Sequence, residues 1–116
     1  MARRGGRQGE AVSGSEAKFH VGQLVLHLRF GYRGVIFDVD PVFQETEEWY
    51  AAMATSRPPK ESPWYRVLVH GELHTTYVAE RNLEADGSTT PIDHPLIDVL
   101  FSGFANGRYV TEHTFN

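Results

Sequence analysis

Apolar and polar residues alternate along two stretches in the first third of the chain, residues 23–28 and 35–40. A period of two is the pattern of a β-strand. Between the stretches lie Gly31 and Gly34, and glycine permits a tight turn at positive φ. The pattern predicts an antiparallel hairpin, with Gly34 at positive φ or at a bulge. Pro41 cannot donate to a strand ladder, so the second strand is expected to end there.

The pattern changes to helical spacing between Pro41 and Pro63. Residues 45–54 are rich in alanine and glutamate, and three of them are spaced for one helical face: Trp49, Ala52 and Met53. A short helix is predicted here, followed by a proline-rich linker that cannot continue it. An insertion of this length in a compact domain often carries function.

Two further strands are predicted over residues 64–70 and 73–79, where valine, tyrosine and threonine are frequent. Gly71 and Glu72 between them fit a two-residue hairpin loop of type II′. Residues 80–83 are expected to form a single helical or 3₁₀ turn. Trp64 follows the proline-rich linker, and we expect it to be only partly buried.

Residues 90–92 fit a short final strand, and the apolar residues after Pro95 follow helical spacing as far as Asn106 and Gly107. A C-terminal helix that ends at this asparagine–glycine pair is therefore predicted. Four or five short strands without βαβ alternation indicate a mainly β fold. We expect a small antiparallel barrel with a short helical insertion and a C-terminal helix.

A length of 116 residues with 41% hydrophobic content fits one domain with a single core. The expected division is a disordered basic tail over residues 1–17, a folded domain over 18–110 and an extension over 111–116. No apolar run is long enough to span a membrane, and the basic N-terminus lacks the apolar segment of a secretory signal. Cysteine is absent, which fits a reducing compartment. The protein is expected to be cytoplasmic.

The net charge of −4 is unevenly distributed. Residues 1–18 carry four cations and two anions, whereas the remainder carries seven cations and thirteen anions. DNA binding depends largely on the neutralisation of phosphates by cationic side chains. The acidic body therefore favours a protein partner over duplex DNA.

The sequence contains no nucleophile motif and no phosphate-binding loop, and we expect neither an enzyme nor a cofactor. Asp38 and Asp40 share one face of a predicted strand, but Asp40 precedes a proline and is interpreted as a turn former. His70 and His74 flank a predicted hairpin without a third ligand, so no metal site is predicted. His27 is interpreted as a strand histidine bonded to a neighbour rather than as a general base.

Aromatic and cationic side chains beside the predicted turns are the candidate binding residues. One group lies at the tip of the first hairpin, and a second group begins after Pro63. Loops on a rigid scaffold often carry binding residues, and aromatic residues and arginine dominate interface energetics. The predicted binding residues are Tyr32, Arg33, Trp64, Tyr65, Arg66 and Tyr77.

Several ordered blocks occur between residues 18 and 109. They include Lys18-Phe19, Val21-Gly22-Gln23, Gly31-Tyr32, Gly34-Val35, Asp38-Val39-Asp40-Pro41, Pro63-Trp64-Tyr65 and Thr76-Tyr77-Val78-Ala79-Glu80. With these blocks the chain resembles the heat-shock protein HspQ family, also described as the YccV-like hemimethylated-DNA-binding domain. The resemblance implies an SH3-like barrel that binds hemimethylated DNA and takes part in heat-shock proteostasis, with members linked to substrate delivery to the Lon protease. Arg66 departs from the pattern, since many relatives have histidine after Pro-Trp-Tyr.

The leading hypothesis is a non-enzymatic binding protein of the HspQ type, an adaptor whose partner is a protease or an unfolded client. The alternative is direct recognition of hemimethylated duplex DNA by a regulator of replication or transcription, with Arg33 and Arg66 at phosphates. A small hydrolase that uses Asp38 or His27 is the weakest hypothesis. No membrane partner is expected, and the sequence leaves a homo-oligomer open.

Overall fold

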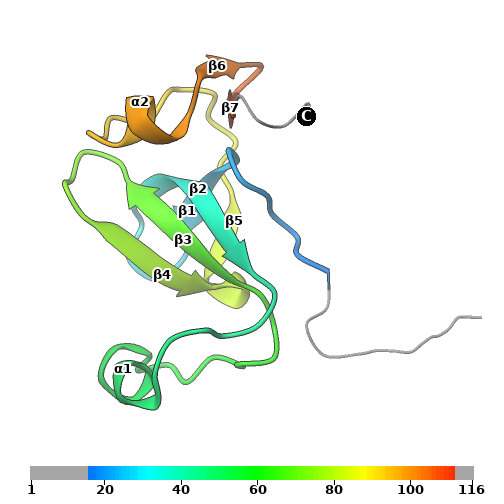
Figure 1. Cartoon of the computed structure of the whole chain (residues 1–116), viewed down its shortest axis with the longest axis vertical. Coiled ribbons are helices and arrows are strands. Elements are labelled where there is room, and N and C mark those ends of the chain that lie inside the picture. The colour runs from blue at the N-terminus through cyan, green and yellow to red at the C-terminus, as the bar shows by residue number, and fades with distance from the viewer. Residues whose placement is uncertain (1–15, 112–116) are drawn as a thin grey trace, which may run out of the picture.

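The computed structural model describes residues 16–111 and contains one five-stranded antiparallel sheet in the order β4-β3-β2-β1-β5. The strands are β1 (Leu24–His27), β2 (Arg33–Asp40), β3 (Trp64–Val69), β4 (Thr75–Ala79) and β5 (Leu83–Ala85). Figure 1 shows helix α1 at one end of the sheet and helix α2 with strand β6 at the other. These elements span Glu47–Met53 (α1), Ile97–Leu100 (α2), Gly103–Ala105 (β6) and Arg108–Val110 (β7). The mainly β prediction is confirmed.

The sheet is an open ladder in the described part of the chain, with β4 and β5 as its edge strands. The antiparallel sheet is confirmed, whereas its closure into a barrel stays a prediction. The predicted 3₁₀ turn is present at Glu80–Asn82, but residues 90–92 form no strand. Within residues 16–111 no helix has the length and apolar content to cross a membrane. The predictions for residues 1–17 and 111–116 fall almost wholly outside the described residues.

The predicted hairpin is present as β1 and β2, but the expectation for Gly34 is wrong. Gly31 has a positive φ of 75°, whereas Gly34 does not have a positive φ. The bulge of β2 lies further along the strand, within residues 36–38. Gly34 lies in the ladder, where a Cβ atom would clash with Cγ1 of Val67 and lie 2.6 Å from the carbonyl oxygen of Leu68. Glycine is therefore required here by close packing and not by its φ angle.

Apolar side chains cover both faces of the sheet, because successive residues of a strand point to opposite faces. The first face carries the cluster Phe19, Val25, Ile36, Tyr65, Val67, Val78 and Leu83. The second face carries Leu24, Val35 and Leu68 under Ile92, Phe101 and Tyr109 of the C-terminal segment. A further cluster on the second face, next to α1, contains Tyr50, Ala54, Trp64 and Ala79.

Helix α1 begins after Thr46, whose hydroxyl accepts a hydrogen bond of 3.0 Å from the backbone N–H of Trp49. This is an N-cap, and the two glutamates of the first turn interact favourably with the helix dipole. The predicted helix is confirmed, but its predicted apolar face is wrong in part. Tyr50 is the buried residue, whereas Ala52 and Met53 are exposed. The hydroxyl of Tyr50 donates to the carbonyl of the linker residue Pro58 at 2.7 Å.

The predicted C-terminal helix is wrong beyond Leu100. Phe101 leaves the helix in an extended conformation and packs against Tyr109, with 5.2 Å between ring centroids. Asn106 and Gly107 have φ values of 57° and 76°, and they connect β6 to β7. Positive φ at both central residues is typical of the type I′ hairpin turn. The asparagine–glycine pair therefore closes a hairpin and does not end a helix.

The predicted two-residue loop at Gly71 and Glu72 is also wrong. The connection between β3 and β4 spans residues 70–74. The N–H of Glu72 donates to the carbonyl of Val69 at 3.2 Å, which makes Gly71, with a φ of 78°, the third residue of the turn. A hydrogen bond to a distant segment of the chain helps to fix this longer loop: the N–H of Gly71 donates to the carbonyl of Asp93 at 2.8 Å.

Candidate functional site

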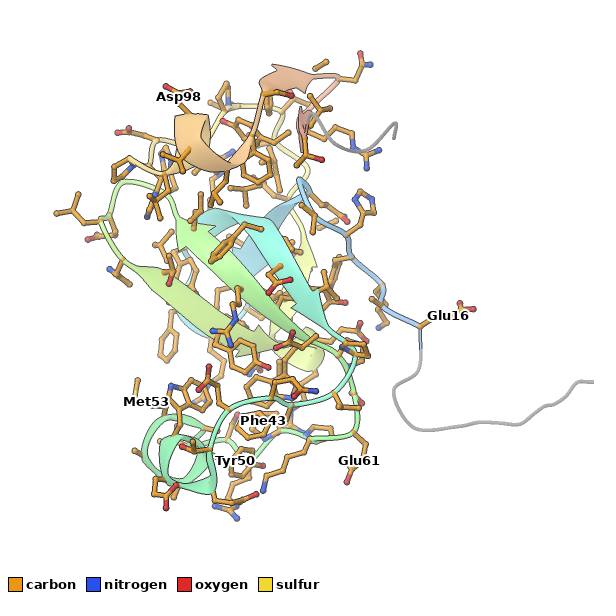
Figure 2. All side chains as sticks on the ribbon, in the orientation of Figure 1. Glu16, Phe43, Tyr50, Met53, Glu61 and Asp98 are labelled. Carbon is orange, nitrogen blue, oxygen red and sulfur yellow. The ribbon has the colours of Figure 1, made fainter. Side chains whose placement is uncertain are left out.

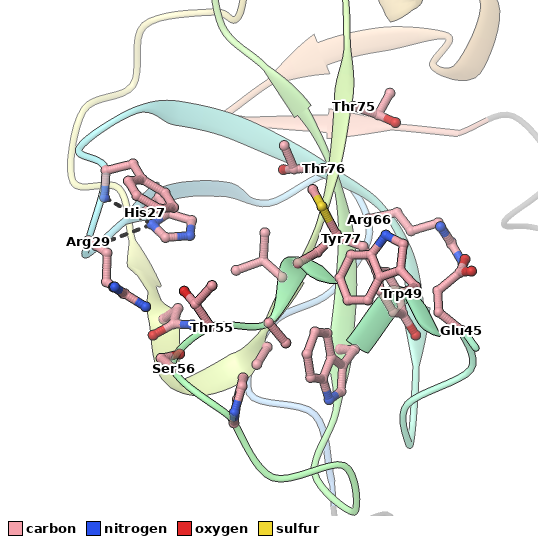
Figure 3. Close-up of a pocket in the computed structure, with 18 of the residues that line it drawn as sticks. His27, Arg29, Glu45, Trp49, Thr55, Ser56, Arg66, Thr75, Thr76 and Tyr77 are labelled. Atoms are coloured by element: carbon pink, nitrogen blue, oxygen red, sulfur yellow. Dashed lines mark hydrogen bonds and ion pairs between the residues drawn. The ribbon is translucent and has the colours of Figure 1, made fainter. Parts of the chain in front are cut away.

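A groove of about 620 Å³ runs along strand β4 (Figure 3). All residues of β4 line it. One side is formed by the turn between β1 and β2, which contributes His27, Arg29, Phe30 and Tyr32. The other side is formed by α1 and the residues after it, which contribute Trp49, Met53, Ala54, Thr55, Ser56 and Pro58. Segments far apart in the sequence therefore form one site.

The groove follows the edge of β4 and not one of its faces. Thr76 and Val78 point to the first face of the sheet, whereas Thr75, Tyr77 and Ala79 point to the second. All of them line the groove. Side chains from both faces can line one groove only where it follows the edge of a strand. Since β4 ends the sheet, the groove contains the unpaired side of this strand.

An aromatic cluster lies next to α1, where Figure 2 shows Phe43 and Tyr50 close together, and three of its members, Trp49, Trp64 and Tyr77, line the groove. The rings of Trp64 and Tyr77 stack at 5.2 Å, and Trp49 meets the ring of Tyr77 edge-on at 5.5 Å. Trp64 is only 1% exposed, so the expectation of partial burial is wrong. The linker folds over it, and its indole N–H donates to the carbonyl of Pro59 at 3.0 Å.

Arg66 lies over the ring of Tyr77, 4.2 Å from the ring centroid, and donates to the Glu45 carboxylate at 2.7 Å. Burial opposes the charge of Arg66, but the bond to Glu45 and nearby negative charges outweigh it and raise the pKa of the guanidinium. The hydroxyl of Tyr77 donates to Asp40 at 2.6 Å. Burial and this bond raise the pKa of Tyr77. The positive charge of Arg66 is thus neutralised within the protein.

The opposite side of the groove is organised by His27. Its Nδ1 accepts hydrogen bonds from the backbone N–H groups of Arg29 at 3.1 Å and Phe30 at 3.2 Å. Its ring lies 4.8 Å from that of Phe30 and 4.9 Å from that of Tyr32. Burial, and to a lesser degree the charge of Arg29, lower the pKa of His27. This agrees with the interpretation of His27 as a histidine bonded to a neighbour. The turn is held by an unprotonated imidazole nitrogen.

The structure brings four of the six predicted binding residues to the groove and leaves two outside it. The four are Tyr32, Trp64, Arg66 and Tyr77. Tyr65 points to the first face and is fully buried, with its hydroxyl bonded to Glu80 at 2.6 Å. Arg33 points to the second face and is bonded to Asp86 at 2.6 Å. The binding roles of all six residues stay predictions.

Two strong features of the groove are absent from the predicted binding residues: Phe30, and Met53, which the sequence indicates only as a residue of the helix face. Their exposed fractions are 71% and 63%, and they come from opposite sides of the groove. Trp49 was recognised only as a helix-face residue, yet it lines the groove in a half-buried position. Phe30 could have been noticed, because it is an apolar residue within a turn between Arg29 and Gly31.

Cationic side chains in the described residues are dispersed, and several have partners inside the protein. Residues 16–111 contain eight lysines and arginines against thirteen aspartates and glutamates. Three of the cations are ion-paired: Arg33 with Asp86, Lys60 with Glu47, and Arg66 with Glu45. Within residues 16–111, three of the eight cations are thus neutralised by carboxylates of the protein itself.

One local group of arginines lies at the end of the groove next to residues 55–56. Arg81 donates to the carbonyl of Ser56 at 2.6 Å, and the N–H of Leu28 donates to the carbonyl of Asn82 at 2.8 Å. These bonds join the segments that carry Arg29, Arg57 and Arg81. Of the three, Arg29 lines the groove and lies over the ring of Phe30, whereas Arg57 lies over the ring of Tyr50.

Comparison with known protein families assigns most of the chain to one family. Residues 17–108 match the profile of the family described as hemimethylated DNA-binding protein YccV like. The chain belongs to the YccV-like family. The match covers every strand of the five-stranded sheet and every residue that lines the groove along β4. The predicted family membership is confirmed.

Proposed function

We propose that this YccV-like protein is a non-enzymatic binding protein of the HspQ type, which holds a segment of a protein partner in the groove along β4. In this proposal the partner is an unfolded client or a protease of the Lon kind, and the protein acts in the cytoplasm during heat shock. The proposal keeps the SH3-like description of the sheet that the family resemblance implies.

The observation that carries the proposal is the exposure of Phe30 and Met53 on the two sides of one groove. Single exposed apolar side chains are common on protein surfaces. Here, however, two large ones border a groove that also contains Trp49 and the edge of β4. Apolar surface arranged in this way supports contact with an apolar partner segment.

Direct binding of hemimethylated DNA is the second candidate, and the family description supports it. The arginines at the groove end, Arg29, Arg57 and Arg81, are the structural observation in its favour. The excess of carboxylates in residues 16–111 counts against a strong electrostatic contribution. We therefore rank DNA below a protein partner.

Fluorescence anisotropy with two labelled probes tests the proposal. The first probe is reduced, carboxymethylated lactalbumin, which is permanently unfolded, and the second is a hemimethylated duplex. We expect the unfolded protein to bind, and binding of the duplex to be weak. For the duplex, log K against log salt is expected to have a slope shallower than about −4.

The matched variants separate the groove from general surface hydrophobicity. Phe30→Ser with Met53→Ser is expected to weaken binding of the unfolded protein at least several-fold. Leu73→Ser with Val99→Ser removes two apolar side chains of similar exposure, 84% and 73%, that do not line the groove. This control is expected to bind as the wild type does. A steep salt slope with clear preference for the hemimethylated duplex, together with no binding of unfolded protein, would show that DNA and not a protein segment is the main ligand.

A further inference from the structure

We infer that the partner segment binds as an added β-strand, paired with the open edge of β4. The inference rests on the proposed function and specifies how the groove holds its ligand. Strand addition supplies affinity through backbone hydrogen bonds and selectivity through alternate side chains. It requires an edge with free N–H and C=O groups and space beside that edge.

The backbone direction of β4 follows from one hydrogen bond. The N–H of Glu80 donates to the carbonyl of Pro63 at 3.1 Å, which continues the ladder between β4 and β3. Since backbone groups alternate along a strand, the even-numbered residues of β4 bond towards β3. Thr75, Tyr77 and Ala79 therefore direct their N–H and C=O groups away from β3. Ala79 is only 3% exposed, so the accessible part of this edge lies at Thr75 and Tyr77. In residues 16–111, no backbone hydrogen bond joins these three residues to any segment on that side.

Within its own sequence, β4 lacks the devices that usually prevent pairing at an edge. Natural edge strands are protected by prolines, charged residues, bulges or very short length. Strand β4 has the sequence TTYVA, with no charge, proline or glycine, and its pairing with β3 is regular. The opposite edge strand, β5, has only three residues and carries Glu84 at an exposed position. Of the two edges, β4 is the one suited to accept a strand.

The lining of the groove defines the chemistry of the added strand. Its side chains would point alternately to the side of Phe30 and to the side of Trp49 and Met53, so each side offers a large exposed apolar side chain. The only carboxylate in the lining, Glu45, is paired with Arg66. Within the described residues Arg29 contacts no carboxylate and lies over the ring of Phe30. The ligand is therefore an extended, apolar peptide segment with an acidic residue or a terminal carboxylate near Arg29.

A backbone N-methyl scan tests strand addition on the wild-type protein. The probe is the tightest-binding peptide from an array of overlapping 13-residue lactalbumin peptides, resynthesised with one N-methyl group at each position in turn. Strand addition predicts that affinity falls at every second position and is nearly unchanged between them, over the few peptide residues that lie beside residues 75–77. Uniform losses, or losses at neighbouring positions, would show that the peptide binds without strand pairing.

Two variants at Thr75 test the same inference from the side of the protein. Thr75 is exposed and begins an edge strand, where proline is tolerated, and Thr75→Pro removes one outward N–H. We expect Thr75→Pro to weaken peptide binding about five- to tenfold, the size of one lost hydrogen bond, with unchanged circular dichroism. Thr75→Val retains the N–H, and we expect it to bind the peptide more tightly than Thr75→Pro does. Equal affinities for the two variants would contradict the inference.

The results also separate strand addition from the proposed function. Peptide binding that is sensitive to Phe30 and Met53 but shows no N-methyl alternation would support the groove and reject the added strand. The absence of binding by any peptide and by the unfolded protein would reject both. Arg29→Gln is expected to remove the preference of the array for peptides with an acidic residue at one end.

Discussion

The guanidinium of Arg33 donates through Nε to the carboxylate of Asp86 at 2.6 Å, and its Nη2 donates to the carbonyl of Thr90. These bonds join the start of β2 to the segment that follows β5. The side chains are 21% and 10% exposed, so the pair is largely removed from water. Arg33 thus connects the central strand β2 to the segment after β5 and does not line the groove.

We predict that Arg33→Gln lowers the free energy of unfolding by about 1–3 kcal/mol, the usual contribution of hydrogen bonds to a charged group. Binding of unfolded protein should be unchanged in the folded variant. Chemical denaturation of the wild type, of Arg33→Gln, of Asp86→Asn and of the double variant measures the coupling free energy between the two residues. Additive losses in the double variant, or loss of binding without loss of stability, would contradict this structural role.

Gly34→Ala is predicted to destabilise the protein by about 2–4 kcal/mol, because the added Cβ clashes with Val67 and with the backbone of Leu68. Gly71→Ala is the control. Gly71 has a φ of 78° and open space around its Cα, so only backbone strain of about 1 kcal/mol is expected. Denaturation midpoints compare the two variants. A loss for Gly34→Ala no larger than that for Gly71→Ala would contradict the close packing.

Acid is predicted to destabilise the turn that carries Phe30. The pKa of His27 is lowered from its ordinary value of 6.5, so the unfolded chain binds the proton more readily than the folded one. The contribution of neutral His27 to the free energy of unfolding is therefore complete above about pH 6.5. It is lost as the pH falls from there towards the pKa of His27 in the folded state. Protonation would also place a hydrogen on Nδ1, which accepts from Arg29 and Phe30.

His27→Asn is the matched variant, because an amide oxygen can take the place of Nδ1 as acceptor but does not titrate. Urea denaturation between pH 5 and pH 8 should show a smaller loss of stability at low pH for the variant than for the wild type. The other histidines contribute equally to the pH dependence of stability in the wild type and in the variant. Parallel stability curves for the two proteins would show that His27 is not the titrating group.

Local patterns predicted much of the fold. The hairpin of β1 and β2, the helix α1 and the 3₁₀ turn each depend on spacing within a few residues, and all three are present. The helix predicted through Asn106 failed because the same asparagine–glycine pair can end a helix or close a hairpin. The packing of Phe101 on Tyr109, which decides between these outcomes, is a contact that local spacing does not reveal.

The candidate site was only partly predictable for the same reason. Tyr32 and Arg33 were treated as one surface, although strand alternation alone places neighbouring side chains on opposite faces. Trp64 is predicted from the sequence to be only partly buried, but the linker that covers it is positioned by tertiary contacts. The groove forms where α1 and the turn between β1 and β2 lie beside β4, an arrangement that no local pattern contains.

Amide chemical-shift mapping tests the central claim most directly. The isotopically labelled protein is titrated with the lactalbumin peptide and, separately, with a hemimethylated duplex. The account predicts that the peptide shifts amide signals along β4 (Thr75–Ala79) and at Arg29, Phe30 and Met53, with little change on the opposite edge at β5. Peptide-induced shifts confined to other surfaces, or a duplex that shifts the groove signals while the peptide leaves them unchanged, would contradict it.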